Sequence, residues 1–445
     1  MRRTVRAALS ATLVAPALAL GTGVSAAEPE TPLANTQESL RTGFEKSDAR
    51  RWTTLQEEHA FLRQLDRQSR RVVVSQVGTT IEGRPLQLVQ VGHPRPAPPR
   101  RAARGSVIFF VCSQHGNEPA PREACLQLAR DLAFTHNPVW VRLLRRTTVL
   151  FMTANPDGRA ADTRGNAKGI DINRDYLRLQ TPEARAITRV MNRWNPDVVE
   201  DMHEYGGDPE VYDAALTHLW PRNRNVDQQV YRQSKGLNNH YAAPEVEALG
   251  YDTGIYGLLY HNGEAFAQVS GDEQARKLRN YVGMRHSVGM LTESNVNPVT
   301  PREAQDKQTL RKRRVNVQYV ASTGTLQFIL ERRRRIDHVT ERAADRAAAR
   351  GGTPQQVIYF AGQNHRLPTD PDNVDITPPC GYQLTADQYQ SIERTLQLQQ
   401  IEVDRQGDGY VVSMSQPSSY VIPLLLDDRG PHNVVSAEPL EKCSG

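Results

Sequence analysis

The chain alternates apolar runs with polar segments in a way that predicts strands followed by helices. Four apolar runs are bounded by Gly, Pro or polar residues, as buried strands are, and they cover residues 105–112, 147–153, 195–203 and 287–292. Helical spacing covers 53–69 and 122–132, and a further helix should start where Thr181 precedes Pro182. This alternation predicts an α/β fold: a three-layer α/β/α arrangement on a doubly wound mixed sheet.

The pattern changes toward the C-terminal end of the chain. Residues 301–350 are strongly charged and helical, and their charge runs are typical of a solvated helix face rather than of a polyanion or cell-wall contact. We predict a main domain over 51–335, a helix and Pro-rich linker over 336–379, and a small α+β module over 380–445.

The first residues have the pattern of a secretory signal. Basic Arg2, Arg3 and Arg6 precede the apolar stretch Ala7–Leu20, and small residues then suggest cleavage near Ala26 or Ala27. General secretion is favoured over the twin-arginine route, and Pro16 and the polar continuation argue against a membrane anchor. We therefore predict a signal peptide over 1–27, a disordered or extended segment over 28–50, and a secreted protein without stable membrane insertion.

Charge and cysteine content narrow the class of protein. The 445 residues include 55 Lys and Arg against 50 Asp and Glu, and three of the arginines lie in the signal, so the remainder is close to neutral. A nucleic-acid-binding domain should show a concentrated basic face, so this class is excluded.

Export permits disulfides. Cys380 and Cys443 are predicted to pair, whereas Cys112 and Cys125 are predicted to be small buried apolar residues, with a bridge between them not favoured.

Candidate chemistry lies where the apolar runs end. His115 and Glu118 follow the first run, His203 ends the third, and Glu293 follows the fourth. Two histidines and a glutamate suit zinc, and three protein ligands leave a fourth position for water, as in catalytic sites. A carboxylate at Glu293 could accept a proton from that water.

The spacing of His115 and Glu118 is not specific by itself. The same spacing recurs from His261 to Glu264 and from His338 to Glu341. His338 lies in the charged helical stretch, and His261 is more simply a loop histidine, so neither is favoured as a ligand.

An arginine-containing segment lies between the second and third candidate ligands. The turn signal Asn155–Gly158 leads to Arg159, Arg164 and the stretch Ile170–Tyr176. A guanidinium presents a planar fork of donors that fits a carboxylate or a developing oxyanion.

Five stretches together resemble the zinc metallocarboxypeptidase family, the relatives of carboxypeptidase A, in a secreted bacterial-type form. They occur in the family's order, within a resemblance that extends from about Trp52 to about Val320. The stretches are Gln114–Glu118, Asn155–Gly158, Thr163–Tyr176, Asp201–Glu204 and Leu291–Glu293.

The resemblance implies a role for each matched residue. His115, Glu118 and His203 would hold one zinc ion per chain, and Glu293 would be the general base. Arg164 would polarise the scissile carbonyl and stabilise the oxyanion. A preorganised cation and guanidinium are suited to that task.

The resemblance also implies a substrate. Asn173 and Arg174 would bind the free C-terminal carboxylate of a peptide or protein, which explains cleavage of its last peptide bond. The tyrosine that closes over the substrate in this family could be Tyr251, Tyr256, Tyr260 or Tyr281. The residue that sets side-chain preference lies in Gly271–Tyr281.

Other functions fit the same framework. A zinc amidase or deacylase, or a peptidase for cell-wall peptides, would keep the ligands and the base. An endopeptidase would conflict with a carboxylate clamp, and a catalytically inactive peptide-binding relative should have lost Glu293 or a ligand, which this chain has not. Neither the physiological substrate nor the oligomeric state follows from the sequence.

Overall fold

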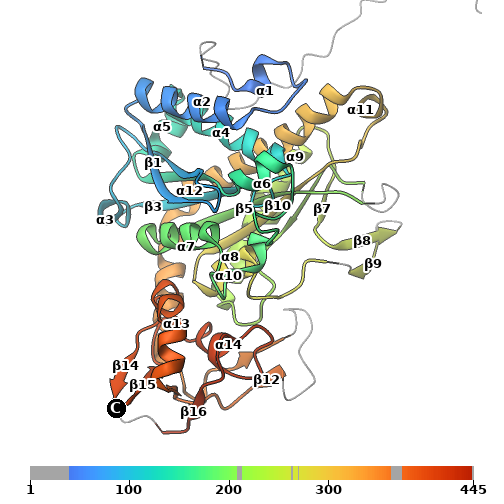
Figure 1. The fold of residues 1–445 in the computed structure, drawn as a ribbon. Coiled ribbons are helices and arrows are strands. Elements are labelled where there is room, and N and C mark those ends of the chain that lie inside the picture. The colour runs from blue at the N-terminus through green and yellow to red at the C-terminus, as the bar shows by residue number, and fades with distance from the viewer. Residues whose placement is uncertain (1–39, 208–212, 262–263, 269, 362–372, 443–445) are drawn as a thin grey trace, which may run out of the picture. The chain divides into compact units, whose positions relative to one another are not determined.

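The centre of the protein is an eight-stranded mixed sheet (Figure 1). The computed structural model describes residues 40–207, 213–261, 264–268, 270–361 and 373–442. From edge to edge, the sheet contains β1 (Val72–Thr79), β2 (Pro85–Val91), β4 (Thr147–Thr153), β3 (Ser106–Cys112), β5 (Val198–Tyr205), β10 (Val288–Asn295), β6 (Leu216–Leu219) and β7 (Thr253–Ile255).

Strand direction explains why one edge of this sheet can hold a site. β4, β3, β5 and β10 run parallel to one another, whereas β2 pairs antiparallel with β4 and β6 pairs antiparallel with β10. The carboxyl ends of the four parallel strands therefore meet at one edge, where open α/β sheets bind ligands. These strands include the four apolar runs of the sequence, which confirms the predicted α/β class.

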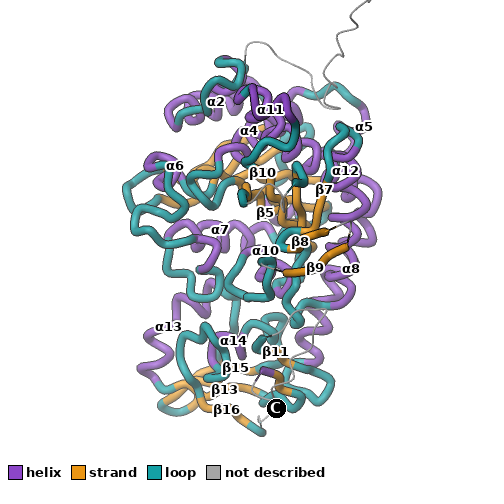
Figure 2. The backbone as a smooth tube through the Cα atoms, turned by 90° about the vertical axis from the view of Figure 1, so that its right-hand side faces the viewer, coloured by secondary structure: helices purple, strands orange, loops and turns teal. Residues whose placement is uncertain are grey.

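Helices cover both faces of the sheet, as Figure 2 shows. One face packs against a large apolar cluster to which many helices contribute: α1 (Gly43–Lys46), α2 (Leu55–Gln68), α4 (Pro119–Phe134), α5 (Pro138–Leu144), α8 (Gln228–Leu237), α9 (Ala243–Glu247) and α12 (Lys307–Arg350). The opposite face packs against α3 (Pro99–Ala102), α7 (Pro182–Trp194) and α10 (Leu278–Met284). The remaining elements of this region are short: α6 (Pro156–Ala161), η1 (Ile172–Arg174), η2 (Asn238–Ala242), α11 (Pro301–Gln305), β8 (Leu258–His261) and β9 (Glu264–Gln268).

β3 shows how one strand serves both layers. All seven of its residues are buried. Ile108 and Phe110 belong to the first cluster, and Val107 and Phe109 belong to the second. Successive side chains of a strand point to opposite faces, so a fully apolar strand requires cover on both sides.

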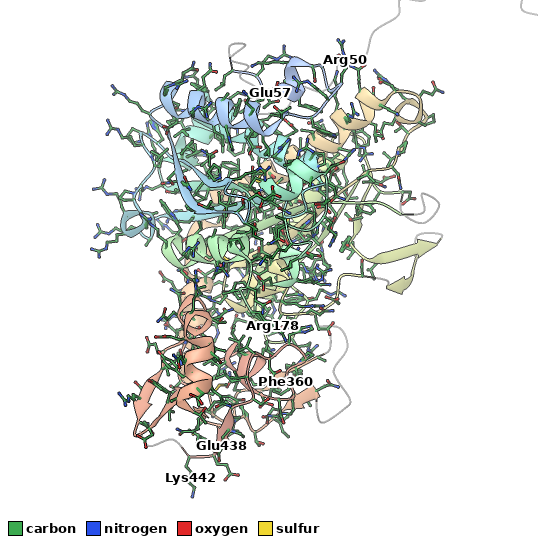
Figure 3. All side chains as sticks on the ribbon, in the orientation of Figure 1. Arg50, Glu57, Arg178, Phe360, Glu438 and Lys442 are labelled. Carbon is green, nitrogen blue, oxygen red and sulfur yellow. A yellow bond between two sulfur atoms is a disulfide. The ribbon has the colours of Figure 1, made fainter. Side chains whose placement is uncertain are left out.

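The C-terminal part has its own small sheet, in the order β14 (Asp404–Gln406), β15 (Gly409–Ser413), β13 (Gly381–Leu384) and β16 (Glu438–Leu440). Its other elements are α13 (Ala386–Leu398), α14 (Ile422–Leu426), β11 (Ile358–Tyr359) and β12 (Val374–Asp375). This is the α+β composition that the sequence predicted. Tyr281 of α10 donates a hydrogen bond to Gln399 (2.8 Å), and Arg178, labelled in Figure 3, donates one to the carbonyl of Asn433 (3.2 Å).

Several predicted details can be compared with the structure. Thr181 caps α7 with Pro182 in its first turn, and α12 ends at Arg350 before Gly351, as expected. Within the segment 28–50, predicted to be disordered or extended, residues 43–46 form α1, because Phe44 is buried and stacks on Trp52.

Two predictions fall on residues that the structure does not describe. The predicted signal peptide, residues 1–27, lies outside the described residues, and so does Cys443, the partner predicted for Cys380. Among the described residues, no helix combines the length and apolar character needed to cross a membrane.

Candidate active site

The loop that contains His115 and Glu118 is fixed at both ends. A disulfide joins Cys112, at the end of β3, to Cys125 in α4, with the two Cα atoms 6.6 Å apart. Both cysteines are buried, as predicted, but the bridge between them, which the sequence allowed without favouring it, is present. The sharp turn between β3 and α4 brings the two residues within disulfide reach, which spacing along the chain does not show.

Contacts inside the loop hold it further. The Ser113 hydroxyl donates to the carbonyl of Glu118 (2.6 Å). A Cβ at Gly116 would lie 2.0 Å from the carbonyl carbon of Gly158, so only glycine fits this approach. Asn155 donates from its side chain to the carbonyl of Gln114 (3.0 Å) and caps α6 through the amide of Gly158. The Asn155–Gly158 motif thus supports the loop that carries the candidate ligands.

Strand pairing positions the other two candidates. His203 of β5 and Glu293 of β10 are register partners in parallel strands, so their side chains emerge side by side on one face of the sheet. His203 is 1% exposed and Glu293 is 6% exposed. The structure therefore brings all four predicted residues to the same edge of the sheet.

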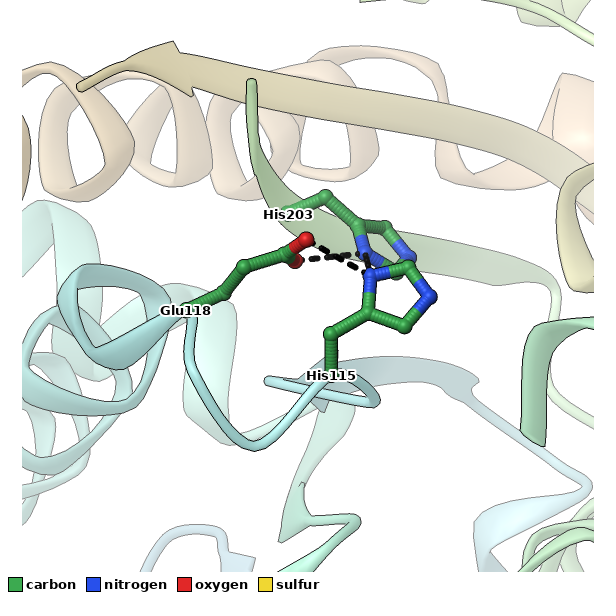
Figure 4. Close-up of side chains that lie close together, drawn as sticks. All are labelled: His115, Glu118 and His203. Atoms are coloured by element: carbon green, nitrogen blue, oxygen red, sulfur yellow. Dashed lines mark hydrogen bonds and ion pairs between the residues drawn. The ribbon is translucent and has the colours of Figure 1, made fainter. Parts of the chain in front are cut away.

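Figure 4 shows three of these side chains converging. His115 Nδ1 lies 2.7 Å from Glu118 Oε1, and His203 Nδ1 lies 2.9 Å from Glu118 Oε2 and 3.0 Å from His115 Nδ1. One ligand atom from each residue lies within 4.8 Å of the others. The three residues form a buried group that could hold a metal ion.

Two aspartates orient the imidazoles. His115 Nε2 faces Asp171 (3.1 Å), and His203 Nε2 faces Asp201 (2.7 Å). A carboxylate at Nε2 favours the proton there, which leaves the Nδ1 lone pairs directed at each other and at Glu118. Two lone pairs and a carboxylate that converge in this way can bind a cation between them, so the donor set fits a metal ion. His2Glu sets are found in catalytic zinc sites.

The charges of the three candidate ligands agree with this interpretation. Burial alone would raise the pKa of Glu118, but His115 and His203 lower it to about 2. Burial alone would lower the pKa of His203, but Asp201 and Glu118 raise it well above its ordinary value. The site thus favours a carboxylate together with positive charge, which is the balance that a bound divalent cation would satisfy.

Glu293 is a carboxylate of the site that no group among the described residues engages. Among the described residues, it has no hydrogen bond or ion pair, whereas Glu118 contacts both histidines. Burial raises the pKa of Glu293 to about 8, with Glu118 and Asp201 adding to the shift and His203 opposing it. An unengaged carboxylate with a raised pKa suits proton transfer near neutral pH.

Arg164 lies directly beside the candidate ligands. Its Nη1 is 3.2 Å from His115 Nδ1 and 3.7 Å from Glu118, and its Nε and Nη2 donate to Asp171 at 3.1 and 2.9 Å. The side chain remains 48% exposed. A guanidinium anchored on one side and open on the other can meet an oxygen of a bound molecule.

Asn173 and Arg174 lie on η1, next to the same group. The Asn173 amide donates to Asp201 (3.1 Å) and lies 3.0 Å from His203 Nε2, and the side chain is buried. Arg174 donates to the carbonyl of Asn173 (2.8 Å), and its side chain is 32% exposed. Arg174 therefore offers the more accessible positive charge, while Asn173 also braces the histidine.

The structure distinguishes among the candidate tyrosines. Tyr256 lies in the turn between β7 and β8, and its pKa is raised first by Glu293 and then by burial, so the hydroxyl is close to the predicted base. Tyr281 is buried against Tyr176, and Tyr251 lies beside Glu303. The structure does not describe the side chains of Tyr260 and His261.

The sequence interpretation missed the roles of Asp171 and Asp201. Asp201 precedes His203 by two residues in a strand, and a period of two places both side chains on one face. That spacing was a usable signal. Asp171 could not be found in this way, because it reaches His115 through the fold of an irregular loop.

The fold is of the α/β class, and three buried side chains at the carboxyl edge of its sheet could hold a metal ion. The family model described as zinc carboxypeptidase matches residues 58–250. A probable carboxypeptidase 2 of Trichophyton verrucosum (strain HKI 0517) is 26% identical over 223 residues, which cover 48% of this chain and 43% of that protein. Carboxypeptidase 2 of Trichophyton rubrum is 26% identical, covering 53% of this chain and 45% of that protein. Residues 58–250 of the chain are therefore similar to the zinc carboxypeptidase family.

Among solved structures, the chain matches a metallo-carboxypeptidase from Burkholderia cenocepacia. It is 19% identical with a TM-score of 0.48, and the match covers 62% of this chain and 69% of that one. The chain spans less than half the length of the curated relatives that it matches.

Proposed function

We propose that this protein is a secreted, zinc-dependent metallocarboxypeptidase that removes the last residue of peptides or proteins. The observation that carries the proposal is the arrangement at the sheet edge: a convergent His2Glu set beside Glu293, a carboxylate that no described group engages. A structural role would not require an unengaged carboxylate to be held 6% exposed next to Glu118 and His203.

His115, Glu118 and His203 would hold the zinc ion, with Asp171 and Asp201 fixing the two imidazoles. Bound there, zinc would lower the pKa of a water molecule and polarise the scissile carbonyl. Glu293 would accept the proton of the attacking water and deliver it to the nitrogen of the leaving amino acid. Arg164, fastened by Asp171, would stabilise the negative charge that develops on the carbonyl oxygen.

Arg174, with Asn173 beside it, would bind the C-terminal carboxylate of the substrate. A clamp for that carboxylate sets the distance from the chain end to the attacked bond, which limits the reaction to the last residue. Tyr256 is the tyrosine we place at the substrate, because its hydroxyl lies close to Glu293.

The proposal of export is supported by the basic and apolar pattern of residues 1–27. The Cys112–Cys125 disulfide agrees with it, because such bonds persist in oxidising compartments.

Mass spectrometry of a peptide pool treated with the zinc-loaded mature protein tests the proposal. We expect single residues to be lost from C-termini, and the same peptides with amidated C-termini to resist cleavage. Internal cleavage, or equal turnover of amidated peptides, would contradict the carboxylate clamp. No cleavage by protein with stoichiometric zinc would contradict the proposed activity.

A further inference from the structure

Arg279 is a buried arginine in the segment predicted to set side-chain preference. It lies in the first turn of α10 and is 3% exposed. Its Nη2 donates to the backbone carbonyl of Asp272 (2.6 Å). Among the described residues, Arg279 forms no ion pair, and its buried Nε has no hydrogen-bond partner. A buried guanidinium without a carboxylate is costly, and burial lowers its pKa.

The nearest carboxylates are committed to other groups. Asp272 binds Lys277 Nζ (2.6 Å) and the side-chain amide of Gln274 (2.9 Å). Asp201 faces His203 and also accepts a hydrogen bond from Gln114 (2.5 Å). Neither is an ion-pair partner of Arg279, so no carboxylate among the described residues pairs with its guanidinium.

A short series of contacts connects Arg279 to the proposed active site. The amide of Leu278, its neighbour, donates to the side-chain carbonyl of Asn173 (2.7 Å), and Asn173 contacts His203. On the other side, a Cβ at Gly271 would lie 2.8 Å from the carbonyl of Tyr256, so the loop that holds Arg279 runs against that tyrosine. Arg279 thus follows a residue that contacts the proposed carboxylate clamp, and its charge acts on Tyr256.

Charges of both signs surround Arg279. Asp272, Tyr256 and Asp201 favour its positive charge, and Arg222 opposes it. Arg174 acts on both Arg276 and Lys277, lowering the pKa of each, although burial has the larger effect. A substrate with a second carboxylate would relieve this repulsion, whereas a substrate with a C-terminal Lys or Arg would increase it.

We propose that Arg279 is a specificity-determining residue that selects peptides whose C-terminal residue is Glu or Asp. The inference rests on the proposed function: Arg174 binds the α-carboxylate and Arg279 pairs with the side-chain carboxylate of the same residue. A guanidinium that is already buried and fixed by Asp272 binds a carboxylate with little further ordering.

The test uses four blocked peptides that differ only in their last residue: Glu, Gln, Lys or Leu. Glu and Gln have the same shape, so their ratio of kcat/KM reports charge alone. For the zinc-loaded wild type, we expect that ratio to be about 30 or more, the scale of a charge-assisted hydrogen bond. R279Q, which removes the positive charge, should bring the ratio close to unity, and R279K should retain part of the preference.

Binding provides a second readout. Zinc-loaded E293Q should bind the Glu peptide more tightly than the Gln peptide in calorimetry, and E293Q/R279Q should bind them about equally. R285Q is the matched control, because Arg285 follows α10 directly but contacts Asn192, Gln400 and Tyr281 instead. It should leave the Glu to Gln ratio unchanged. Circular dichroism and zinc content identify any variant that has not folded. The ratio of kcat/KM for the Glu and Gln peptides in the wild type tests the proposal without any variant.

The outcomes separate the two proposals. C-terminal cleavage that favours Gln, Lys or Leu over Glu would overturn the role of Arg279 and leave the carboxypeptidase assignment intact. A Glu preference that persists in folded R279Q would also overturn it, since another residue would then supply the charge. If no peptide loses its last residue, the proposed function fails, and the specificity falls with it.

Discussion

Removing the Cys112–Cys125 disulfide should weaken the fold more than the metal site. The bond closes a loop with a sequence separation of 13, and this loop contains both His115 and Glu118. For a loop of this length, the lost restriction of the unfolded chain costs about 3 kcal/mol. With an unfolding entropy of about 2.1 cal/mol/K per residue, this corresponds to a decrease in Tm of about 3 °C.

The metal site should change less, because other contacts hold the loop in the folded state. Ser113, Asn155 and the close packing of Gly116 do not depend on the disulfide. We therefore expect the zinc affinity of C112A/C125A to fall less than about 10-fold, whereas Asn155→Ala, which removes a direct support, should lower it more.

The assay measures thermal and urea unfolding of metal-free protein, so that zinc binding does not add to the apparent stability. Zinc affinity is then measured by competition with a chelator. Trypsin can cut after Arg122, so non-reduced digests of the wild type should contain a linked pair of peptides, 105–122 and 123–130.

Two results would refute this reasoning. An unchanged free energy of unfolding would mean that the bond does not restrict the unfolded chain. A loss of zinc affinity beyond about 100-fold would mean that the disulfide, rather than the hydrogen bonds of the loop, holds the ligands in place.

Three further predictions concern the chemistry of the site. Glu293→Gln should reduce kcat by about 10²–10⁴-fold at unchanged zinc content, the range for a lost general base, and near-normal turnover would exclude that role. The carboxylate is the active form of Glu293, and burial raises its pKa to about 8, so kcat/KM should fall as the pH decreases through that pKa. Bound zinc would lower this pKa, so the midpoint of the pH-rate profile should lie between the ordinary value of 4.5 and about 8. A pH-rate profile that stays flat on the acid side would contradict the assignment. Asp201→Ala should weaken zinc binding by about 10–100-fold in chelator competition, because His203 loses its partner at Nε2. His261→Ala should retain stoichiometric zinc. The reverse pattern would mean that His261, rather than His203, binds the metal.

The apolar runs and the residues at their ends determined much of the site from the sequence. Buried parallel strands require apolar side chains on both faces, so the runs before His115 and Glu293 were visible as strands, and polar residues at strand ends were expected to converge. The ordered motifs added the arginines between Asn155 and Tyr176. Each of these features is formed by residues that are close in the sequence, so the sequence alone is enough to recognise it.

The tertiary structure decided what depends on distances between segments. It joined Cys112 to Cys125 across a sharp turn, placed Asp171 and Asp201 behind the two histidines, and brought Tyr256 close to Glu293. It also buried Arg279 with no ion pair to any described residue, although the sequence showed only one more arginine in a basic stretch. The physical reason is that burial and the positions of opposite charges are properties of packing, and packing brings together residues that spacing along the chain keeps apart.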